Sequence, residues 1–219
     1  MSERKINISD SLSSILEKMT ESELEATRKM FSFYMEQYDT LRLENNAESV
    51  SSAMHGAIDG AMADIIKETK EKPSCGKGCS FCCFLQVDIS DDEAVLLKEY
   101  SREIGVDIDY NHLEKQLSAS NEEFLKLPLS ERKCVFLDGF ASCKVYEHRP
   151  SACRKLLVVS DPALCDTDKN MGAKVGRLVS VEAEVLTSSL LNARESGSMA
   201  KMLIKAKEGN KFVVNIKNT

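Results

Sequence analysis

The segment CGKGCSFCC, from Cys75 to Cys83, carries four cysteines in nine residues. The chain has eight cysteines, and all of them lie in its middle, away from both ends. Cysteines that serve only as small buried hydrophobic residues should be scattered along a chain. A metal site instead needs several thiolates that converge on one point, so the clustering predicts metal binding. The predicted metal ligands are Cys75, Cys79, Cys82, Cys83, Cys134, Cys143, Cys153 and Cys165.

Nothing in the sequence indicates secretion, which would favour disulfides. The first residues, MSERKINISDSLSSILEKM, are charged early and amphipathic, and they lack the apolar stretch and cleavage site of a signal peptide. No stretch approaches the ~18 apolar residues that a membrane span needs. We therefore expect a cytoplasmic protein without membrane contact, whose thiols are kept reduced. Metal ligation or redox chemistry then explains the cysteines better than a disulfide framework.

Three kinds of cysteine chemistry fit such a chain. Zinc takes four ligands in a closed tetrahedron, often from two CxxC pairs, and only Cys79 and Cys82 have that spacing. Iron–sulfur clusters also take four thiolates and accept irregular spacings. Zinc and an iron–sulfur cluster both stay open as cofactors, with a slight preference for the cluster. Thiol exchange is the third option, but nothing around Cys79 and Cys82 resembles a thioredoxin βαβ unit.

The spacing Cys75-x3-Cys79-x2-Cys82 is also the one with which radical S-adenosylmethionine enzymes bind their cluster. Those enzymes fold as a barrel of alternating strands and helices, which the helical pattern of this chain does not supply. No Gly-Gly-Glu follows either. We do not assign that activity, because a motif without its structural context misleads.

The adjacent pair Cys82 and Cys83 raises the question of one metal centre or two. Neighbouring side chains diverge on an extended backbone, so the two thiols would not serve one single ion comfortably. Either they serve two sites, or one is a ligand while the other packs. Cys83 and Cys165 have a further alternative as simple buried thiols, since free cysteine is commonly buried.

The region before the cysteines is predicted to be helical. A first helix should follow a cap at Ser9 or Asp10, and Thr20 with Glu23 forms a capping box that starts a second helix. ENNAES interrupts the pattern before a third helix. We expect the two longer helices to form an antiparallel hairpin packed on the rest of the chain. The apolar face of the third helix is Val50, Met54, Ile58, Ala61 and Ile65.

Short strands and further helices are predicted after the cysteine-rich segment. Residues 85–89 alternate as a strand, and Ser90 with Glu93 forms a capping box for a helix that Gly105 ends. DYNHLEKQL and SNEEFLKLP are expected to be helices, and Pro128 closes the second.

CVFLDGFASCKVY has two apolar runs around Asp138-Gly139, which predicts a β-hairpin. Pro150 is placed to start a helix, residues 176–194 predict another, and SMAKMLIKA predicts a last short one. The expected fold class is mainly α with small β-hairpin elements, a helical bundle wrapped around a cysteine-ligated metal site. The expected regions are a helical 1–72, a metal-binding 73–170 and a helical 171–219.

Composition limits the partners. The formal net charge is -6 with acids and bases mixed, which argues against nonspecific nucleic-acid binding. The chain has no tryptophan and only 6% aromatic residues, so a surface for stacking bases is not expected either. The N-terminal helices favour core packing, with a protein-binding face as the alternative.

A few residues near the cysteines are candidates to support a metal centre. Arg149 and Arg154 flank Cys153 and would offset thiolate charge or hydrogen-bond the sulfurs, with structural ion pairs as an equal alternative. Tyr146 is expected in the core, and His148 is a minor candidate ligand. His55 and His112 lie on helical patterns and are expected to be ordinary, and SDDE at residues 90–93 is expected to be a solvated, capped helix start.

Together these residues resemble the YkgJ-type cysteine-cluster family, a zinc- or iron-chelating domain with a CxxCxxCC signature. The resemblance covers roughly residues 75–165 and rests on CGKGCSFCC, CVFL, CKVYEHRP, CR at Cys153-Arg154, and PALC, in this order. The first gap has three residues rather than the two of the family signature. The resemblance implies metal chelation by these cysteines. A related motif occurs in flagellin lysine-N-methylases, but the chain shows no separate glycine-rich nucleotide loop, so methylation would rest on analogy.

The resulting hypothesis is a metal-binding protein whose cysteines hold an iron–sulfur cluster or zinc, with a structural, metal-handling or electron-transfer role. The alternative class is an enzyme, resembling a methyltransferase or an oxidoreductase, that uses the centre beside a pocket. A third hypothesis is a zinc-stapled adaptor that binds a protein partner through its N-terminal helices.

Overall fold

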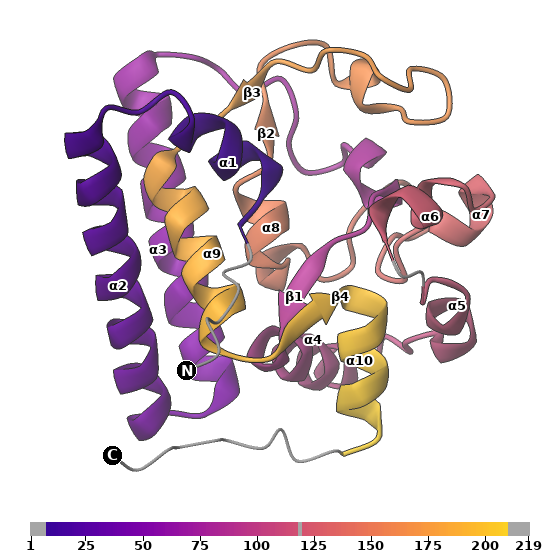
Figure 1. The fold of residues 1–219 in the computed structure, drawn as a ribbon. Helices are drawn as coiled ribbons and strands as arrows, with labels where there is room; N and C mark the ends of the chain where they lie inside the picture. The colour runs from indigo at the N-terminus through magenta and orange to yellow at the C-terminus, as the bar shows by residue number, and fades with distance from the viewer. Residues whose placement is uncertain (1–7, 118–119, 210–219) are drawn as a thin grey trace.

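The computed structural model describes residues 8–117 and 120–209. Over these residues the chain is mainly α-helical with short antiparallel strand pairs, which confirms the expected fold class (Figure 1). No helix in these ranges is long and apolar enough to cross a membrane.

The helices and strands alternate irregularly along the chain. The longer helices are α2 (Glu21–Glu44), α3 (Ala47–Thr69), α4 (Asp91–Glu103), α9 (Val181–Ala193) and α10 (Met199–Lys207). The shorter ones are α1 (Asp10–Leu16), α5 (Tyr110–Lys115), α6 (Asn121–Leu125), α7 (Leu129–Arg132) and α8 (Ser151–Arg154). Three 3₁₀ turns are η1 (Phe81–Phe84), η2 (Tyr146–His148) and η3 (Pro162–Cys165), and the strands are β1 (Asp88–Ser90), β2 (Leu157–Val158), β3 (Arg177–Leu178) and β4 (Ser196–Ser198).

Local capping places the N-terminal helices where the sequence predicts them. The side chain of Ser9 accepts a hydrogen bond from the backbone of Leu12 and starts α1. Thr20 and Glu23 form the predicted capping box of α2. These bonds satisfy backbone N–H groups that have no partner inside the helix, so the helices begin at these residues.

Helices α2, α3 and α9 lie on the left of Figure 1, so α9 joins the two helices that the sequence predicted to form a hairpin. Helix α9 packs extensively against both α2 and α3, and α2 meets α9 more than it meets α3. The reason lies in α9, whose Val185, Leu186 and Leu190 are all fully buried. A helix that is apolar on several sides must be covered on several sides. Their shared core consists of Tyr38, Val50, Met54, Ile58, Ala61, Met62, Leu178, Ala183, Leu186 and Leu190.

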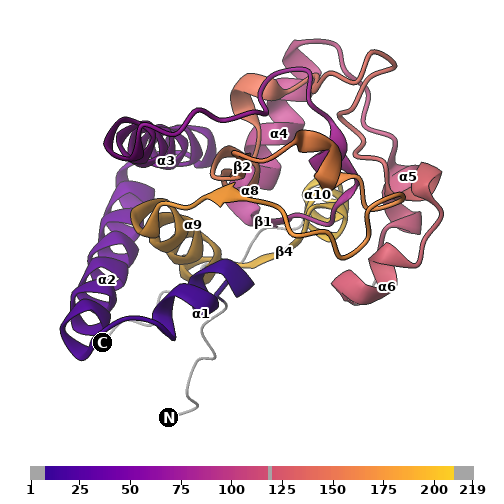
Figure 2. The ribbon, with the colours of Figure 1, turned by 90° about the horizontal axis from the view of Figure 1, so that it is seen from above.

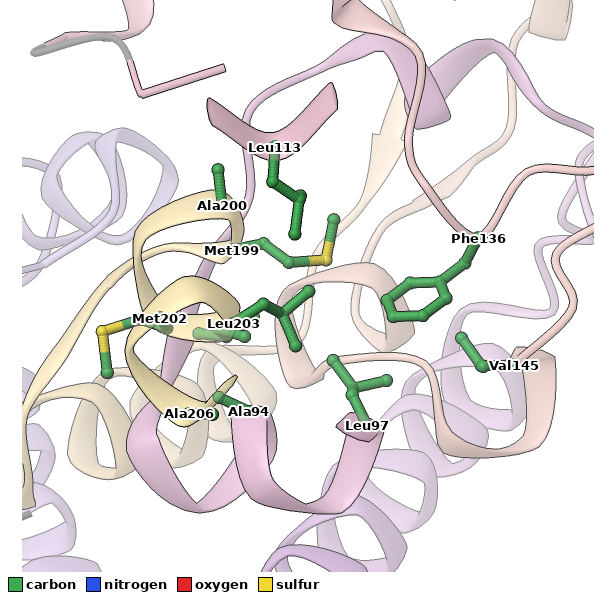
Figure 3. Close-up of a cluster of buried hydrophobic side chains, with 11 residues drawn as sticks. Ala94, Leu97, Leu113, Phe136, Val145, Met199, Ala200, Met202, Leu203 and Ala206 are labelled. Atoms are coloured by element: carbon green, nitrogen blue, oxygen red, sulfur yellow. The ribbon is translucent and has the colours of Figure 1, made fainter. Parts of the chain in front are cut away.

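A second core lies on the other side of the molecule and holds the cysteine-rich region in place. In Figure 3 the side chains of Leu97, Phe136 and Leu203 point toward one another from three different segments. Cys134 and Cys143 pack against this core. The cysteines of the 134–143 loop are therefore anchored by hydrophobic contacts with α4 and α10.

The strand pairs join segments that are far apart in the sequence. Strand β1 pairs antiparallel with β4, with Ile89 opposite Gly197, and β2 pairs antiparallel with β3. Figure 2 shows β1 and β4 between α9 and α10. The predicted strand at residues 85–89 is thus confirmed only over its end, and its partner comes from the C-terminal part of the chain.

The predicted hairpin around Asp138-Gly139 is wrong in its strands. Its two arms meet through Lys144 N–H donating to the Phe136 carbonyl at 2.8 Å, but within residues 120–209 this segment has only one isolated bridge, Leu137 with Cys143. The Asp138 carboxylate instead accepts from the backbone of the loop that follows. Likewise the last long helix starts at residue 181 rather than 176, because β3 occupies residues 177–178.

Candidate metal centre

Seven of the eight cysteines line one mostly apolar cavity of about 110 Å³. They come from the 75–83 segment, from the loop that carries residues 134 and 143, and from α8. The first residues of α10 close another part of the wall, including Met199 and Ala200. The lining cysteines are Cys75, Cys79, Cys82, Cys83, Cys134, Cys143 and Cys153. Cys165 is not part of this lining, but it ends η3, which packs against η1 beside the cavity.

Backbone hydrogen bonds fix these segments to one another. The N–H of Cys134 donates to the carbonyl of Cys83 at 2.8 Å, which joins the loop to the end of η1. The N–H of Val158 donates to Sγ of Cys75 at 3.3 Å, which joins the first cysteine to β2. A turn from Gly76 to Cys79, in which Gly78 has φ 93°, wraps the backbone around the site. A positive φ of this kind favours glycine.

All eight cysteines are free thiols in the structure. Within residues 8–117 and 120–209, no three His, Cys, Asp or Glu side chains form a group that could hold a metal ion as they stand. The cysteines are therefore gathered around a cavity as separate thiols.

Burial keeps most of these thiols protonated in the absence of a cation. It raises the pKa of Cys134 to about 12, and it raises the pKa of Cys153 well above the ordinary value. The neighbouring sulfurs add to the effect, because a second thiolate nearby would repel the first. Bringing several thiolates into this space therefore requires a positive charge, which a metal ion supplies.

Cys82 differs from the other cysteines. A hydrogen bond from the Cys83 thiol lowers the pKa of Cys82 to about 7, although burial opposes this, and the positive charge of Arg149 contributes in the same direction. The expectation that the two adjacent thiols diverge assumed an extended backbone. Residues 81–84 instead form the 3₁₀ turn η1, so that assumption does not apply to this pair. Cys82 is the thiol best prepared to meet a metal as a thiolate.

A buried arginine with an unpartnered N–H lies at the same cavity. Arg132 lines the cavity and is only 3% exposed, and its Nη1 donates to Oγ1 of Thr167 at 2.8 Å. Its Nε has no hydrogen-bond partner in the described residues, which is costly for a buried donor. A thiolate-bound metal centre in the cavity would offer both negative charge and sulfur acceptors. The thiols and this orphan donor therefore fit such a centre, and the sequence had not pointed to Arg132.

The two arginines that flank Cys153 have separate roles. Arg149 lies 4.1 Å from the centre of the Tyr146 ring, and its charge acts on Cys82 and Cys143. Arg154 makes an ion pair with Asp59 of α3 instead, which is the structural role given above as the alternative to contact with the sulfurs.

The aromatic residues and histidines are placed as follows. Tyr146 is half-buried under Arg149 and Lys77, so its predicted place in the core is wrong. The ring of His148 packs against the ring of Tyr100, with centres 4.1 Å apart and planes tilted by 51°. His112 bonds the carbonyl of Lys133 at 2.7 Å and stays an ordinary structural histidine.

The start of α4 is a buried acidic cluster, so the expectation of a solvated helix start is wrong. Each carboxylate is at most 1% exposed and has its own partner. Asp91 pairs with Arg194 at 3.0 Å, and Asp92 pairs with Arg42 at 3.1 Å. Glu93 Oε1 is hydrogen-bonded to Nε2 of His55 at 2.9 Å, so His55 is a buried structural partner of this carboxylate. The partners come from α2, α3 and the end of α9, and a sequence read locally cannot reveal them.

Glu93 also supports one of the cavity-lining segments. Its Oε1 accepts the N–H of Ser151 at 2.7 Å, and Ser151 is the first residue of the four-residue helix that carries Cys153. So short a helix gains little stability from its own hydrogen bonds. The buried carboxylate therefore holds the segment that presents Cys153.

A larger and more polar cavity of about 490 Å³ adjoins the first one. Cys82 and Cys153 line both. Its other wall comes from α1 and α9, where Lys155 pairs with Glu184 and Ser9 donates to Glu184 at 2.6 Å. Two cysteines of the candidate centre are thus reachable from a polar chamber.

The structure is thus a mainly helical fold that gathers free cysteines around one cavity, the arrangement that cysteine-ligated metal binding requires. Residues 74–173, slightly less than half of the chain, match the family model named CxxCxxCC and described as a "putative zinc- or iron-chelating domain". The match confirms the resemblance for this segment and supports metal binding by its cysteines. No curated protein and no solved structure matches the chain.

Proposed function

We propose that the chain is a metal-binding protein whose cysteines bind an iron–sulfur cluster rather than single zinc ions. The observation that carries the proposal is the cavity lined by seven cysteines. Its volume of about 110 Å³ is several times the ~10–15 Å³ that one water-sized sphere occupies. An iron–sulfur cluster contains inorganic sulfide as well as metal and takes thiolates at irregular spacings.

The residues around the cavity suit a sulfur-rich centre. Leu85, Phe136 and Val145 make much of the wall apolar, which keeps water from the sulfurs. Arg132 and Arg149 supply positive charge, which offsets the negative charge of several thiolates. When bound, the centre would supply one-electron redox chemistry. The chain's own residues would bind it, exclude water and balance its charge.

The proposal is tested by purifying the protein without oxygen and measuring iron, zinc and acid-labile sulfide together with the visible spectrum. We expect a brown protein with broad visible absorbance, iron and sulfide. A colourless protein with stoichiometric zinc would show that the metal is zinc and not an iron–sulfur cluster. That result would favour the zinc-stapled adaptor. Metal-free protein with its cysteines in disulfides would overturn metal binding itself.

An enzyme is a second candidate, and the polar cavity of about 490 Å³ favours it. Substrate sites in enzymes have about this size, ~300–1,000 Å³, and this one reaches Cys82 and Cys153. Azide and imidazole are suitable probes of access to a metal there. We expect them to change the visible spectrum of the loaded protein, and Ser188→Phe, which narrows the cavity, to remove that change. A spectrum insensitive to both probes speaks against a substrate site at the metal.

A further inference from the structure

One short segment of the chain forms part of the wall between the two cavities. Residues 149–157 run from the end of η2 through α8 into β2. Cys153, in α8, lines both the cysteine-lined cavity and the polar cavity. Arg149 lines only the first of these cavities, and Lys155 lines only the second. The position of this segment therefore determines where the Cys153 thiol lies and how the two spaces are separated.

This segment has little support of its own. Helix α8 has only four residues, and Pro150 before it provides no capping side chain. A single helical turn is marginal by itself, because fixing its backbone costs more than its few hydrogen bonds return. Its neighbours in space are α3 and β1. Contacts from other parts of the molecule must therefore hold α8 in place.

The N-terminal end of α8 is held by the carboxylate of Glu93 from α4. Its Oε1 accepts the N–H of Ser151 at 2.7 Å and is hydrogen-bonded to Nε2 of His55 at 2.9 Å. Its Oε2 accepts the N–H of Ser90 at 3.0 Å. A side chain of another helix thus satisfies a free N–H at the start of α8, as a capping residue does within its own helix.

The C-terminal end of α8 is held by Arg154, which is only 6% exposed. Its Nε donates to the Arg149 carbonyl at 2.9 Å, and its Nη2 donates to the Glu147 carbonyl. Its Nη1 pairs with the carboxylate of Asp59 on α3. The planar guanidinium makes these bonds in one fixed geometry. Asp59 lies one helical turn after His55, so the same face of α3 reaches both ends of α8.

We propose that Glu93 and Arg154 are positioning residues that hold Cys153 in the wall between the two cavities. Helix α3 anchors them through His55 and Asp59, and it lies outside the segment that matches the zinc- or iron-chelating domain. A ligand whose supporting side chains are already in place loses less freedom when a metal binds. The inference rests on the proposed metal binding for its purpose and adds the residues that prepare one predicted ligand.

The experiment measures alkylation of Cys153 by iodoacetamide in the metal-free protein, with Cys79 of the same sample as the reference. Arg154→Lys keeps the positive charge but cannot make the three bonds, so the ratio of the Cys153 rate to the Cys79 rate should rise about fivefold. Asp59→Asn removes the anchor on α3 and should raise this ratio roughly twofold. Asp64→Asn, the same change at an exposed residue of α3, is the matched control and should leave the ratio unchanged.

The ratio separates positioning from general stability. Loosening of the whole molecule would speed the reaction of all eight cysteines alike, and that result overturns the proposal. An unchanged ratio in both Arg154→Lys and Asp59→Asn overturns it too. Asp59→Glu, which keeps the carboxylate, should restore the wild-type ratio.

Two further measurements keep the test decisive. If circular dichroism shows that Arg154→Lys does not fold, Asp59→Asn decides alone, because the Asp59 side chain is 47% exposed and its change is mild. Metal analysis of the wild type tests the proposed function separately. Wild-type protein without metal would overturn that function, whereas the alkylation ratios would still decide whether Cys153 is held in place.

Discussion

The guanidinium of Arg149 shows how one side chain adjusts the chemistry of the cysteines. It stacks on the ring of Tyr146 and lines the cavity. Together with the hydrogen bond from Cys83, its charge keeps the pKa of Cys82 at about 7. It also opposes the effect of burial, which raises the pKa of Cys143. A fixed positive charge favours the thiolate over the thiol.

Replacing Arg149 with glutamine should therefore raise the pKa of Cys82 in the metal-free protein. At neutral pH we expect iodoacetamide to alkylate Cys82 roughly two- to fivefold more slowly, because less of it is thiolate. Mass spectrometry of digested protein measures the rate at this residue. Arg177→Gln, which removes a charge beside Cys165, is the control and should leave Cys82 unchanged. An unaltered Cys82 rate in Arg149→Gln would contradict the assignment.

The raised thiol pKa values also predict how metal affinity depends on pH. Thiols such as Cys134, with a pKa of about 12, are protonated at neutral pH. Each one must lose its proton to become a ligand, so binding releases protons and affinity rises with pH. Zinc competition with a chromophoric chelator between about pH 6 and about pH 8 should show more than one proton released per ion. Affinity that does not change with pH would show that these thiols are not ligands.

At the scale of elements, the N-terminal end of α4 connects most of the molecule. Its three carboxylates reach α2, α3 and the end of α9 through Arg42, His55 and Arg194. Burial alone would raise the pKa of Glu93, but its hydrogen bonds from His55, Ser151 and Ser90 hold it below the ordinary value. The folded state therefore favours the ionised carboxylate, and this contribution to stability is lost as the pH falls through the lowered pKa.

Glu93→Gln should destabilise the protein by roughly 2–4 kcal/mol, because it removes a buried charge and leaves His55 without its carboxylate. Urea denaturation of the metal-loaded protein gives the free energy of unfolding. Glu99→Gln on the same helix removes a more exposed partner of Arg102 and should cost less than about 1 kcal/mol. Equal losses of unfolding free energy in the two variants would show that the buried carboxylate contributes no more to stability than the exposed one.

Helix α10 is the second element that connects distant parts of the chain. It contributes Met199, Ala200, Met202, Leu203 and Ala206 to the core behind the cysteines, and β4 just before it pairs with β1. Helix α10 and strand β4 both lie outside residues 74–173, the segment that matches the zinc- or iron-chelating domain. The matched segment therefore needs the C-terminal part of the chain to complete its core and its cavity.

A fragment of residues 74–173 should accordingly bind metal poorly and lack a cooperative unfolding transition. Metal analysis and circular dichroism of the fragment, beside the full chain prepared in the same way, test this. A chain that ends at residue 209 keeps α10 and serves as the control, with expected metal content equal to that of the full chain. A fragment that holds the full amount of metal would contradict the argument.

At the scale of the whole molecule, the two hydrophobic cores differ in their relation to the cysteines. The core of α2, α3 and α9 includes no cysteine, whereas the core beside α4 and α10 packs directly on Cys134 and Cys143. Metal ligation is coupled to folding where the ligands are. The two halves should therefore respond differently when the metal is removed.

Hydrogen exchange before and after chelation should show this difference. We expect amides in residues 134–165 to exchange much faster without metal, because their short helices and loops have little other support. Amides in α2, α3 and α9 should keep most of their protection. Uniform loss of protection along the chain would mean that the molecule folds as one unit around the centre.

The sequence alone determined the features that depend on near neighbours. The caps at Ser9, Thr20 and Ser90 start helices where predicted, since a capping bond spans only three residues. The resemblance of residues 74–173 to a zinc- or iron-chelating domain was also readable, because the spacing and flanks of the cysteines are local. Around Asp138 the chain turns back as predicted, but the antiparallel pairing is limited to an isolated bridge between Leu137 and Cys143, and the Asp138 carboxylate accepts hydrogen bonds from the loop.

Only the tertiary structure decided what depends on segments far apart. It buried Asp91, Asp92 and Glu93, whose sequence is that of a solvated helix start, by supplying partners about 40 to 100 residues away. It placed Arg132 at the cavity with an unpartnered Nε. It also brought Cys134, Cys143 and Cys153 to the cavity lined by the 75–83 segment, and η3, which ends at Cys165, against η1. Burial and the partners of a charge are properties of the packed molecule, and no spacing along the chain encodes them.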